Sequence, residues 1–348
     1  MERALLRSIP ARGLDVRTSV DLDSWDDILQ RLGSNVFHSS EWASYTSFAQ
    51  PNAIPHYFSL NDSSGSVCAA LGFVSQSRAH ILRSLWFDAL PVVADSSDGV
   101  ISEFLDMAER WARDSGIHVC SVGSYGYEKG IESLIRQEYA LEKRFEFSIT
   151  LADRGIEDIW SRMDGRRRNN VKAAEKKGVR VSECSSEEGV KTLRRLQAES
   201  SERIIHRGGE NIARSYPSGK DPFLILINGG VARLFIARLG DRPLSALLCS
   251  SYKGRVYCIA GGHAHEGLKY NAGTLLQWEL IERYKEEGTR EFNLGGCKYE
   301  SRDEKSPEHG VYVYKKYFGA ECRECANGMK ILRPISYSLV RTLAHIIE

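Results

Sequence analysis

The sequence lacks any strong excess of charge of one sign. Its 348 residues carry 47 lysine and arginine side chains against 46 aspartate and glutamate side chains, a formal net charge of +1. Because this balance produces no large global field, contact with a nucleic acid has to come from local patches of charge. The composition therefore excludes recognition of a polyanion by net charge alone.

Long apolar runs are also missing. No segment approaches the roughly 20 apolar residues that cross a bilayer as a helix. The first residues, Met1 to Arg7, lack the apolar stretch of a secretory signal peptide. We therefore expect a soluble, cytoplasmic protein without a membrane span.

No Ser-His-Asp or Cys-His set stands out in the sequence. The eight cysteines lie mostly in apolar, strand-like runs such as the one around Cys249, where a reduced cysteine behaves as a small core residue. One His-x-His and one Cys-x-x-Cys could supply zinc ligands, but spacing alone specifies little. These residues are His263, His265, Cys322 and Cys325. We expect no metal, no disulfide framework and no covalent enzyme intermediate.

The most informative stretch that is present runs from residue 252 to residue 320. Its pattern predicts a strand, a Gly-rich turn, a one-faced amphipathic helix, a second strand and a second turn. These occupy residues 255–260, Gly261-Gly262, 274–287, 290–294 and Gly295-Gly296. A strand–helix–strand unit of this size is typical of a crossover between parallel strands.

Strands and helices alternate along the rest of the chain, which favours a mixed α/β (α+β) fold. Strands are predicted at 68–74, 117–122, 145–151, 222–228, 231–238 and 244–251, and helices at 100–112 and 187–203. Turn signals such as Asn228-Gly-Gly separate the later strands, which we expect to pair as an antiparallel meander ending at 255–260. A chain of this length suggests two domains.

Residues 166–177 form a basic segment with six cationic side chains and one acid, a local charge of +5. Arg168, Lys172 and Lys176 follow each other at four-residue spacing, which places them on one face of a helix. Together with Arg166 and Arg167, this face could bind a phosphate backbone. A solvated cationic surface is the alternative.

A second polar segment surrounds Gly208 and Gly209. It clusters basic or titratable side chains, namely Arg203, His206, Arg207 and Arg214. Since arginine binds carboxylates and phosphates through a bidentate fork, this segment suggests a site for an anionic ligand. Asp88, in an irregular stretch with aromatic residues at 84–91, could line a ligand cleft or form a structural turn.

Five short motifs appear in a characteristic order over residues 35–320. They are Phe37…Trp42, the basic helix 168–178, Arg203-x-x-x-Arg207, Phe292-x-Leu-Gly-Gly296 and the aromatic-Lys-x-x-Phe-Gly run Tyr314–Gly319. In this order they resemble the FemABX family, the tRNA-dependent peptidyltransferases of cell-wall peptide bridges. They also resemble its wider relatives with tandem acyltransferase folds of the GNAT kind.

The resemblance implies two tandem GNAT-like domains with mixed, largely antiparallel sheets flanked by helices. Their expected boundaries are 1–147 plus 320–348 for the first domain and 148–319 for the second. It also implies transfer of an activated acyl or aminoacyl group to an amine. The family lysine of the last motif falls on Lys315, which would contact the reacting ester, and Lys316 is its rival.

Further site residues are expected around this lysine. Candidate proton acceptors are Tyr257, His263, Glu266 and Tyr270, and none is preferred from the sequence. Candidate substrate-binding residues are Trp42, Asp88, Arg203, His206, Arg207, Tyr314, Lys316 and Phe318, and candidate tRNA-binding residues are Arg166, Arg167, Arg168, Lys172 and Lys176. Packing in the core is the alternative role for Trp42.

Three functions remain open on the sequence. The first is transfer of an amino acid from aminoacyl-tRNA, as co-substrate and without another cofactor, to a peptide or small-molecule amine. The second is N-acyl transfer from acyl-CoA, although residues around 272–274 lack the full Gln/Arg-x-x-Gly-x-Gly/Ala signature of CoA-binding relatives. The third is a non-catalytic RNA- or ligand-binding protein on the same scaffold.

Overall fold

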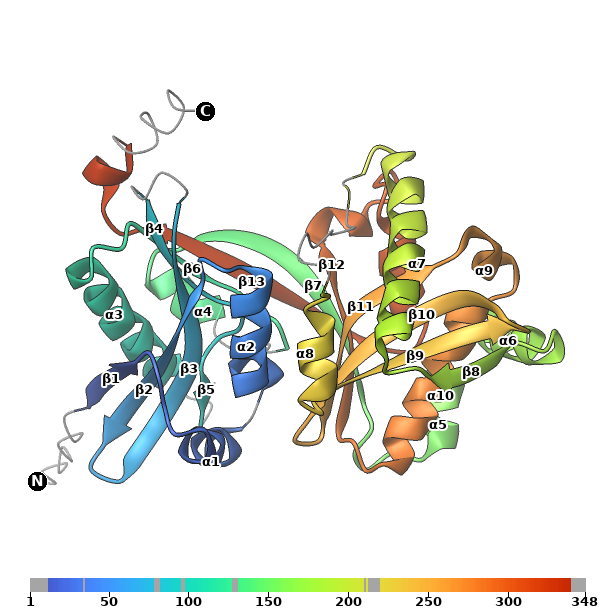
Figure 1. The fold of residues 1–348 in the computed structure, drawn as a ribbon, viewed down its shortest axis with the longest axis horizontal. Helices are drawn as coiled ribbons and strands as arrows, with labels where there is room; N and C mark the ends of the chain where they lie inside the picture. Colours follow the sequence, from blue (N-terminus) through green and yellow to red (C-terminus); the bar gives the residue numbers. More distant parts are fainter. Residues whose placement is uncertain are drawn as a thin grey trace, which may run out of the picture. The chain divides into compact units, whose positions relative to one another are not determined.

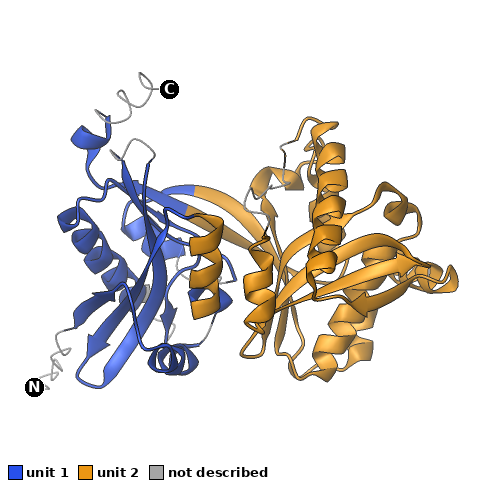
Figure 2. Cartoon of the chain, in the orientation of Figure 1, with its two compact units in different colours: residues 1–39, 51–141, 328–348 blue, residues 40–50, 142–327 orange. Residues whose placement is uncertain are grey.

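The structure is a computed structural model, and it describes residues 12–33, 35–77, 82–94, 98–126, 131–209, 211 and 220–338. The chain divides into two compact units (Figure 2). Unit 1 is built from described residues within 1–39, 51–141 and 328–348, and unit 2 from those within 40–50 and 142–327. In the described part of the chain, no helix is long and apolar enough to cross a membrane.

Unit 1 is a sheet covered by helices (Figure 1). Its elements are β1 (Gly13–Arg17), α1 (Leu22–Leu32), the 3-10 helix η1 (Val36–His38), β2 (Ile54–Asp62), β3 (Gly65–Gln76), β4 (Arg83–Phe87), β5 (Val92–Val93), α3 (Asp98–Asp114), β6 (Val119–Val122) and α4 (Ile131–Arg136). The strands follow the order β1-β2-β3-β4-β6, and all of these neighbours are antiparallel except β4 and β6. The last strand of the chain, β13 (Glu321–Ile331), pairs with β6 through residues 328–331.

Unit 2 carries the stretch that the sequence marked as most informative. Its elements are α2 (Ser40–Ala49), β7 (Ala140–Thr150), α5 (Ile156–Arg162), α6 (Gly165–Lys176), β8 (Arg180–Glu183), α7 (Glu187–Ile205), α8 (Phe223–Asn228), β9 (Ala232–Leu239), β10 (Arg242–Tyr252), β11 (Arg255–His263), α9 (His265–Lys269), α10 (Ala272–Glu286), β12 (Glu291–Lys298), the 3-10 helix η2 (Tyr299–Arg302), α11 (His309–Lys316) and the first part of β13.

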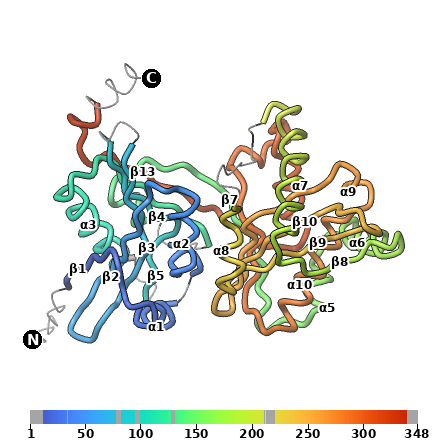
Figure 3. Tube along the Cα trace, in the orientation of Figure 1, coloured from blue at the N-terminus to red at the C-terminus, as the bar shows by residue number. Residues whose placement is uncertain are grey.

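The sheet of unit 2 confirms the parallel crossover and three of the four strands predicted for the meander. Strands β9, β10 and β11 form an antiparallel meander, and β11 and β12 are parallel neighbours joined by α10. On its other side β12 pairs antiparallel with β7, so strands far apart in the sequence lie side by side (Figure 3). The strand order in this unit, which begins with the first part of β13, is β13-β7-β12-β11-β10-β9-β8.

One segment of unit 2 forms a helix where the sequence predicts a strand. Residues 222–228 were predicted as a strand but form the short helix α8. Asp221 explains this, because its carboxylate accepts a hydrogen bond from the Phe223 backbone N–H at 3.0 Å and so satisfies one amide at the start of the helix. The helix then buries Phe223 and Leu226.

The unit boundaries also differ from the expected seam. They lie at 141/142 and 327/328 rather than at 147/148 and 319/320, and residues 40–50 join unit 2. The reason for the last difference is an aromatic contact. In α2, the ring of Trp42 packs on Tyr45 at 4.8 Å, and Tyr45 stacks on Phe223 of α8 at 5.9 Å.

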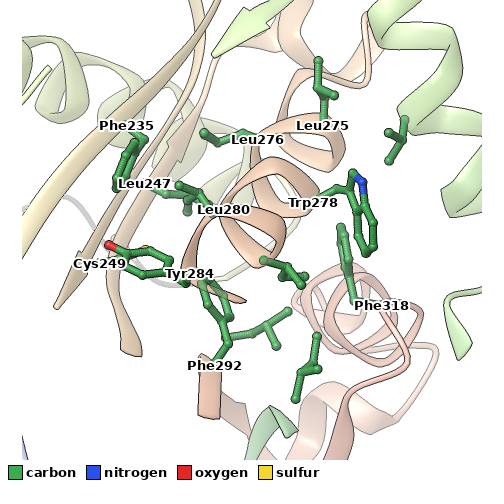
Figure 4. Packing of buried hydrophobic residues seen from close by; sticks show 14 of the residues in the cluster. Phe235, Leu247, Cys249, Leu275, Leu276, Trp278, Leu280, Tyr284, Phe292 and Phe318 are labelled. Carbon is green, nitrogen blue, oxygen red and sulfur yellow. The ribbon is translucent and has the colours of Figure 1, made fainter. Parts of the chain in front are cut away.

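The two faces of the unit 2 sheet are covered by different helices. Leu247 and Cys249, two residues apart on β10, belong to the buried cluster that α10 completes, whereas Gly262 on β11 lies against the backbone of α7. Figure 4 shows side chains of α10 among those of the strands. Its labelled residues are Phe235, Leu247, Cys249, Leu275, Leu276, Trp278, Leu280, Tyr284, Phe292 and Phe318. Helix α10 and helix α7 therefore cover opposite faces.

A buried histidine fixes part of unit 1. His38 is fully buried, and its Nε2 lies 2.8 Å from the carbonyl oxygen of Leu90 while its Nδ1 accepts from the Leu71 N–H at 3.1 Å. A carbonyl can only accept, so Nε2 carries the proton and the imidazole is neutral. Burial lowers the pKa of His38 from 6.5 to about 4.

We expect His38 to make unit 1 sensitive to acid. Because the folded pKa lies below the unfolded one, its contribution is complete above pH 6.5 and is lost as the pH falls from 6.5 to about 4. The loss amounts to roughly 3 kcal/mol. Thermal midpoints measured between pH 7.5 and pH 4 should fall less steeply for His38→Gln than for the wild type, and parallel curves would contradict the assignment.

Candidate functional site

Strands β11 and β12 separate soon after they begin. Their parallel pairing joins residues 255–257 to residues 291–293 and ends there within the described chain. Residues 257–261 are half-exposed although β11 is an interior strand of the sheet. We call this place the strand divergence, because it leaves the edge of β11 open beside β12.

A β-bulge in β12 shapes the strand divergence. Asn293 pairs with Ser148 and Gly296 with Glu146, so the register against β7 shifts between them. Gly295 adopts a φ of +77°, which glycine tolerates, and its N–H donates to the Asn293 side-chain oxygen at 2.7 Å. The sequence predicted a turn here, and Gly261-Gly262 likewise as a turn, but both glycine pairs lie within strands.

Under the bulge lies a buried polar network centred on Glu146. One carboxylate oxygen accepts from Arg144 and from the Tyr257 hydroxyl, both at 2.9 Å, and the other accepts from the Asn293 amide at 3.0 Å. The side chains of Arg144 and Glu146 are only 10% and 4% exposed. A side chain at Gly296 would collide with the Arg144 guanidinium. The network therefore holds Tyr257 and the bulge in one arrangement.

Lys315 reaches the bulge from α11. Its Nζ donates to the carbonyl oxygen of Gly296 at 2.7 Å, and the side chain is half-buried. Burial lowers the pKa of Lys315 from 10.5 to about 8, partly offset by Cys297, Cys258 and Glu146. Lys315 lies in the last turn of α11. The helix directs its ammonium group to the strand divergence.

The neighbours of Lys315 in the motif have different surroundings. The Tyr314 hydroxyl donates to the Gly273 carbonyl oxygen at 2.7 Å, and the Arg167 guanidinium lies 4.8 Å from the Tyr314 ring centre. Lys316 is exposed and lies over the Tyr312 ring. Phe318 is buried in the core. Tyr314 thus contacts the start of α10 and Arg167, whereas Lys316 is exposed to solvent and Phe318 is buried in the core.

His263 lies at the other end of β11, next to the start of α10. Its Nδ1 is 2.7 Å from the Ser245 hydroxyl oxygen, and its ring centre is 6.4 Å from that of Tyr314. Burial, and then the nearby Arg203, lower the pKa of His263 to about 4. Because Ser245 is fully buried, this Ser-His pair holds a neutral imidazole in place rather than exposing a nucleophile.

The expected anion site in the 203–214 segment is not assembled by the described residues. Arg203 turns inward and donates to the His263 carbonyl oxygen at 2.7 Å and to the Ser200 hydroxyl at 3.0 Å. His206 and Arg207 are exposed. Arg214 lies outside the described residues. Arg203 therefore supports the β11 backbone beside the histidine.

The remaining candidates lie in other places. Tyr270 ends α9 with the Lys177 ammonium over its ring, and Glu266 forms an ion pair with Arg242. Trp42 is buried on α2 and packs on Tyr45. Asp88 follows β4 in unit 1 and is half-exposed.

The basic helix α6 divides its charges between two roles. Arg168 donates to the carbonyl oxygens of Ser161 and Met163, which end α5, so it is a helix cap rather than a free cation. Arg166, Lys172 and Lys176 are exposed. Lys172 and Lys176 therefore remain as solvent-exposed cations of the predicted face, and Arg166 is a third exposed cation on the same helix.

Several site residues were missed from the sequence. Only Glu146 could have been predicted as a site residue from the sequence, because it is an acidic residue between Phe145 and Phe147 in a strand of alternating pattern. Arg144, Asn293 and Ser245 had no comparable signal. Within the described ranges no three His, Cys, Asp or Glu side chains gather to hold a metal ion.

The chain is similar to known acyltransferase-fold proteins. The family model of an acetyltransferase (GNAT) domain matches residues 165–316, and no curated protein matches the chain in sequence. Among solved structures, FemX has a TM-score of 0.74 at 15% identity, covering 94% of this chain and 99% of that one.

Two further structures are similar over most of the chain. A tandem GNAT protein from the clavulanic acid biosynthesis pathway has a TM-score of 0.54 at 11% identity, covering 92% of this chain and 99% of that one. A C-terminal DUF2156 domain from Agrobacterium fabrum has a TM-score of 0.55 at 12% identity, covering 92% and 94%. These likenesses confirm the predicted fold of two tandem GNAT-like domains.

Proposed function

We propose that this chain, which is similar to FemX and matches the GNAT domain model, is an aminoacyltransferase. It forms an amide bond on a peptide or small-molecule amine. The donor is aminoacyl-tRNA, and no other cofactor takes part. The observation that carries the proposal is the placement of the half-buried Lys315 at the strand divergence, with its Nζ held by Gly296. The likeness to FemX over the whole chain supports the choice of donor.

In this proposal the reaction is a direct attack. The acceptor nitrogen attacks the ester carbonyl, a C–N bond forms, and the C–O bond to the ribose breaks. Lys315 supplies an ammonium group where negative charge develops on the carbonyl or ribose oxygen. Holding the two reactants in a fixed geometry supplies much of the remaining rate enhancement.

Tyr257 is the proton acceptor that the geometry favours. Its hydroxyl donates to Glu146 at 2.9 Å, which leaves the phenolic oxygen able to accept a proton from the attacking amine while its own proton passes to the carboxylate. His263 is the second candidate, but a pKa of about 4 makes it a weak base. We assign Tyr257 to proton transfer and His263 to positioning at the start of α10.

The exposed cations of α6 supply the contact with tRNA in this proposal. Arg166, Lys172 and Lys176 face solvent on one helix, and Arg167 of the same helix lies over the ring of Tyr314, the residue before Lys315. The tRNA backbone could therefore follow α6 while its charged end enters the strand divergence. Such a reaction belongs in the cytoplasm, where aminoacyl-tRNA is available.

Charge reversal on α6 tests this contact. We expect the triple variant with Arg166→Glu, Lys172→Glu and Lys176→Glu to bind tRNA more weakly and to reduce the slope of log K against log salt by up to about 3. Filter binding at several salt concentrations measures both. Lys191→Glu, at an exposed lysine of α7, is the control and should leave the slope unchanged. An unchanged slope in the triple variant would remove α6 from the proposal.

Acyl-CoA is the second candidate donor. The GNAT family model over residues 165–316 favours it, and the tandem GNAT relative is described in a form without AcCoA. Titration of the purified protein with charged tRNA and with acetyl-CoA at two salt concentrations separates the donors. Salt-sensitive tRNA binding followed by transfer that ribonuclease abolishes supports the first proposal, and acetyl-CoA binding alone replaces it with the second.

A non-catalytic role on the same scaffold is the third candidate. It predicts that tRNA or ligand binding persists and that removal of the Lys315 ammonium changes no biological activity. Transfer of a labelled amino acid or acetyl group by the wild type would exclude it.

A further inference from the structure

Two cysteines face each other across neighbouring strands at the strand divergence. Cys249 on β10 and Cys258 on β11 are direct partners in the antiparallel register, and their sulfur atoms lie 3.4 Å apart. Both are free thiols. The sulfur of Cys258 is also 4.0 Å from the Gln277 side-chain nitrogen of α10. The two thiols are thus held together on the face that α10 covers.

The backbone already has the spacing that a disulfide needs. Directly opposed residues of antiparallel strands have Cα atoms about 4.5–5.5 Å apart, which falls within the usual range of about 4.4–6.8 Å for disulfides. The sulfur atoms would have to approach from 3.4 Å to about 2.05 Å. Rotation of the side chains can provide this movement without a change of strand register.

The two thiols differ in access and in ionisation. Cys258 is half-exposed beside the strand divergence, whereas Cys249 is fully buried. The hydrogen bond from Cys249 lowers the pKa of Cys258, and Lys315 lowers it further, against the effect of burial. The same bond and burial raise the pKa of Cys249. Since the thiolate is the reactive form, Cys258 is the first of the pair to react with an oxidant.

We propose that Cys249 and Cys258 form a peroxide-sensitive dithiol that closes to a disulfide at the strand divergence. The Cys258 thiolate attacks hydrogen peroxide, gives a sulfenic acid and releases hydroxide. Cys249 then attacks the Cys258 sulfur, and the disulfide forms as a second hydroxide leaves and takes up the Cys249 proton as water. The two thiols lose two electrons in total, and one peroxide is reduced to two molecules of water.

The disulfide changes the surroundings of Lys315. The Cys258 thiol is a neighbour of the Lys315 ammonium, and the Cys258 carbonyl oxygen lies next to the bulge at Gly295. Oxidation removes the ionisable thiol and fixes β11 to β10 at this point. This expectation rests on the proposed function: oxidation should reduce the rate of transfer about ten- to a hundred-fold. Small displacements of reacting groups lower the reaction rate strongly.

Peptide mapping tests the thiol pair without any activity assay. Trypsin cleaves after Lys253 and Arg255, so the two cysteines fall in separate peptides. After treatment of the full chain with hydrogen peroxide and alkylation without reductant, we expect mass spectrometry to find these two peptides linked. The count of free thiols in denaturant should fall by two from eight, and dithiothreitol should restore it.

Cysteine-to-serine variants test which thiols form the disulfide. Cys249→Ser should lose the linked peptide and leave Cys258 as a sulfenic or sulfinic acid, whereas the control Cys297→Ser should still form the link. An unmodified pair, or a link from Cys258 to another cysteine in the wild type, would overturn the proposal. If the link forms but no transfer activity exists to be inhibited, the proposed function fails and the thiol pair stands.

Discussion

Lys315→Ala should lower kcat/KM for transfer about a hundred- to a thousand-fold. The variant removes the ammonium group that lies at the strand divergence and donates to the Gly296 carbonyl oxygen. The loss should appear mainly in kcat, because the charge that Lys315 stabilises develops only in the transition state. Initial rates with the donor selected by the binding titration measure it.

Lys316→Ala is the matched control for this variant. Lys316 follows in the same motif but is exposed and lies over the Tyr312 ring, so its removal should change the rate less than about threefold, as expected for a solvated surface charge. A small effect of Lys315→Ala, or equal effects of both variants, would contradict the role given to Lys315.

The pH dependence supplies an independent test of the same lysine. With a pKa of about 8, the ammonium form is complete well below pH 8 and is lost as the pH rises through that value. The rate should therefore decline above about pH 8. Lys315→Arg keeps its charge far above that pH, and any activity it retains should lack the decline. Identical alkaline limbs in both proteins would show that Lys315 does not cause it.

Glu146→Ala should destabilise unit 2 by about 3–5 kcal/mol. The variant leaves the Arg144 guanidinium, whose side chain is only 10% exposed, without its carboxylate, and it removes the acceptor of Tyr257 and Asn293. A buried cation without its anion bears a large desolvation cost. The thermal midpoint of this unit should fall by roughly 10 °C.

An exposed ion pair between β7 and β13 provides a matched control. Lys143 and Glu324 form an ion pair at 2.6 Å, but their side chains are 55% and 43% exposed. Glu324→Ala should cost less than about 1 kcal/mol, because water already screens this pair. Similar losses for the two variants would mean that the Glu146 network contributes no more than a surface contact. Activity should fall only in Glu146→Ala, through the displacement of Tyr257.

Much of the fold followed from local sequence patterns. The apolar face of 274–287 predicted α10 to within two residues at its start, and turn residues predicted the meander of β9, β10 and β11. These predictions succeeded because helix and strand periodicity are properties of neighbouring residues. The prediction of a strand at 222–228 was wrong for the same reason. In so short an apolar run, periodicity cannot distinguish a buried strand from one and a half turns of helix.

The candidate site was predicted only in part. The motif at 314–319 identified the lysine, but the residues that surround it come from distant segments. Glu146 and Asn293 are 147 positions apart in the sequence, and no local pattern records their contact. The two glycine pairs were predicted as turns because glycine is common in turns. In the structure, Gly296 has to be glycine because a side chain there would collide with the Arg144 guanidinium.

The sequence by itself determined the order of the elements, the amphipathic faces and the lysine motif, because these depend on residue type and spacing along the chain. Tertiary structure alone decided that β12 bulges beside β11, that Arg168 caps α5 rather than facing a ligand, and that Cys249 and Cys258 meet. The physical reason is register: pairing of strands distant in the sequence selects which side chains share a face, and a shift of one residue exchanges them.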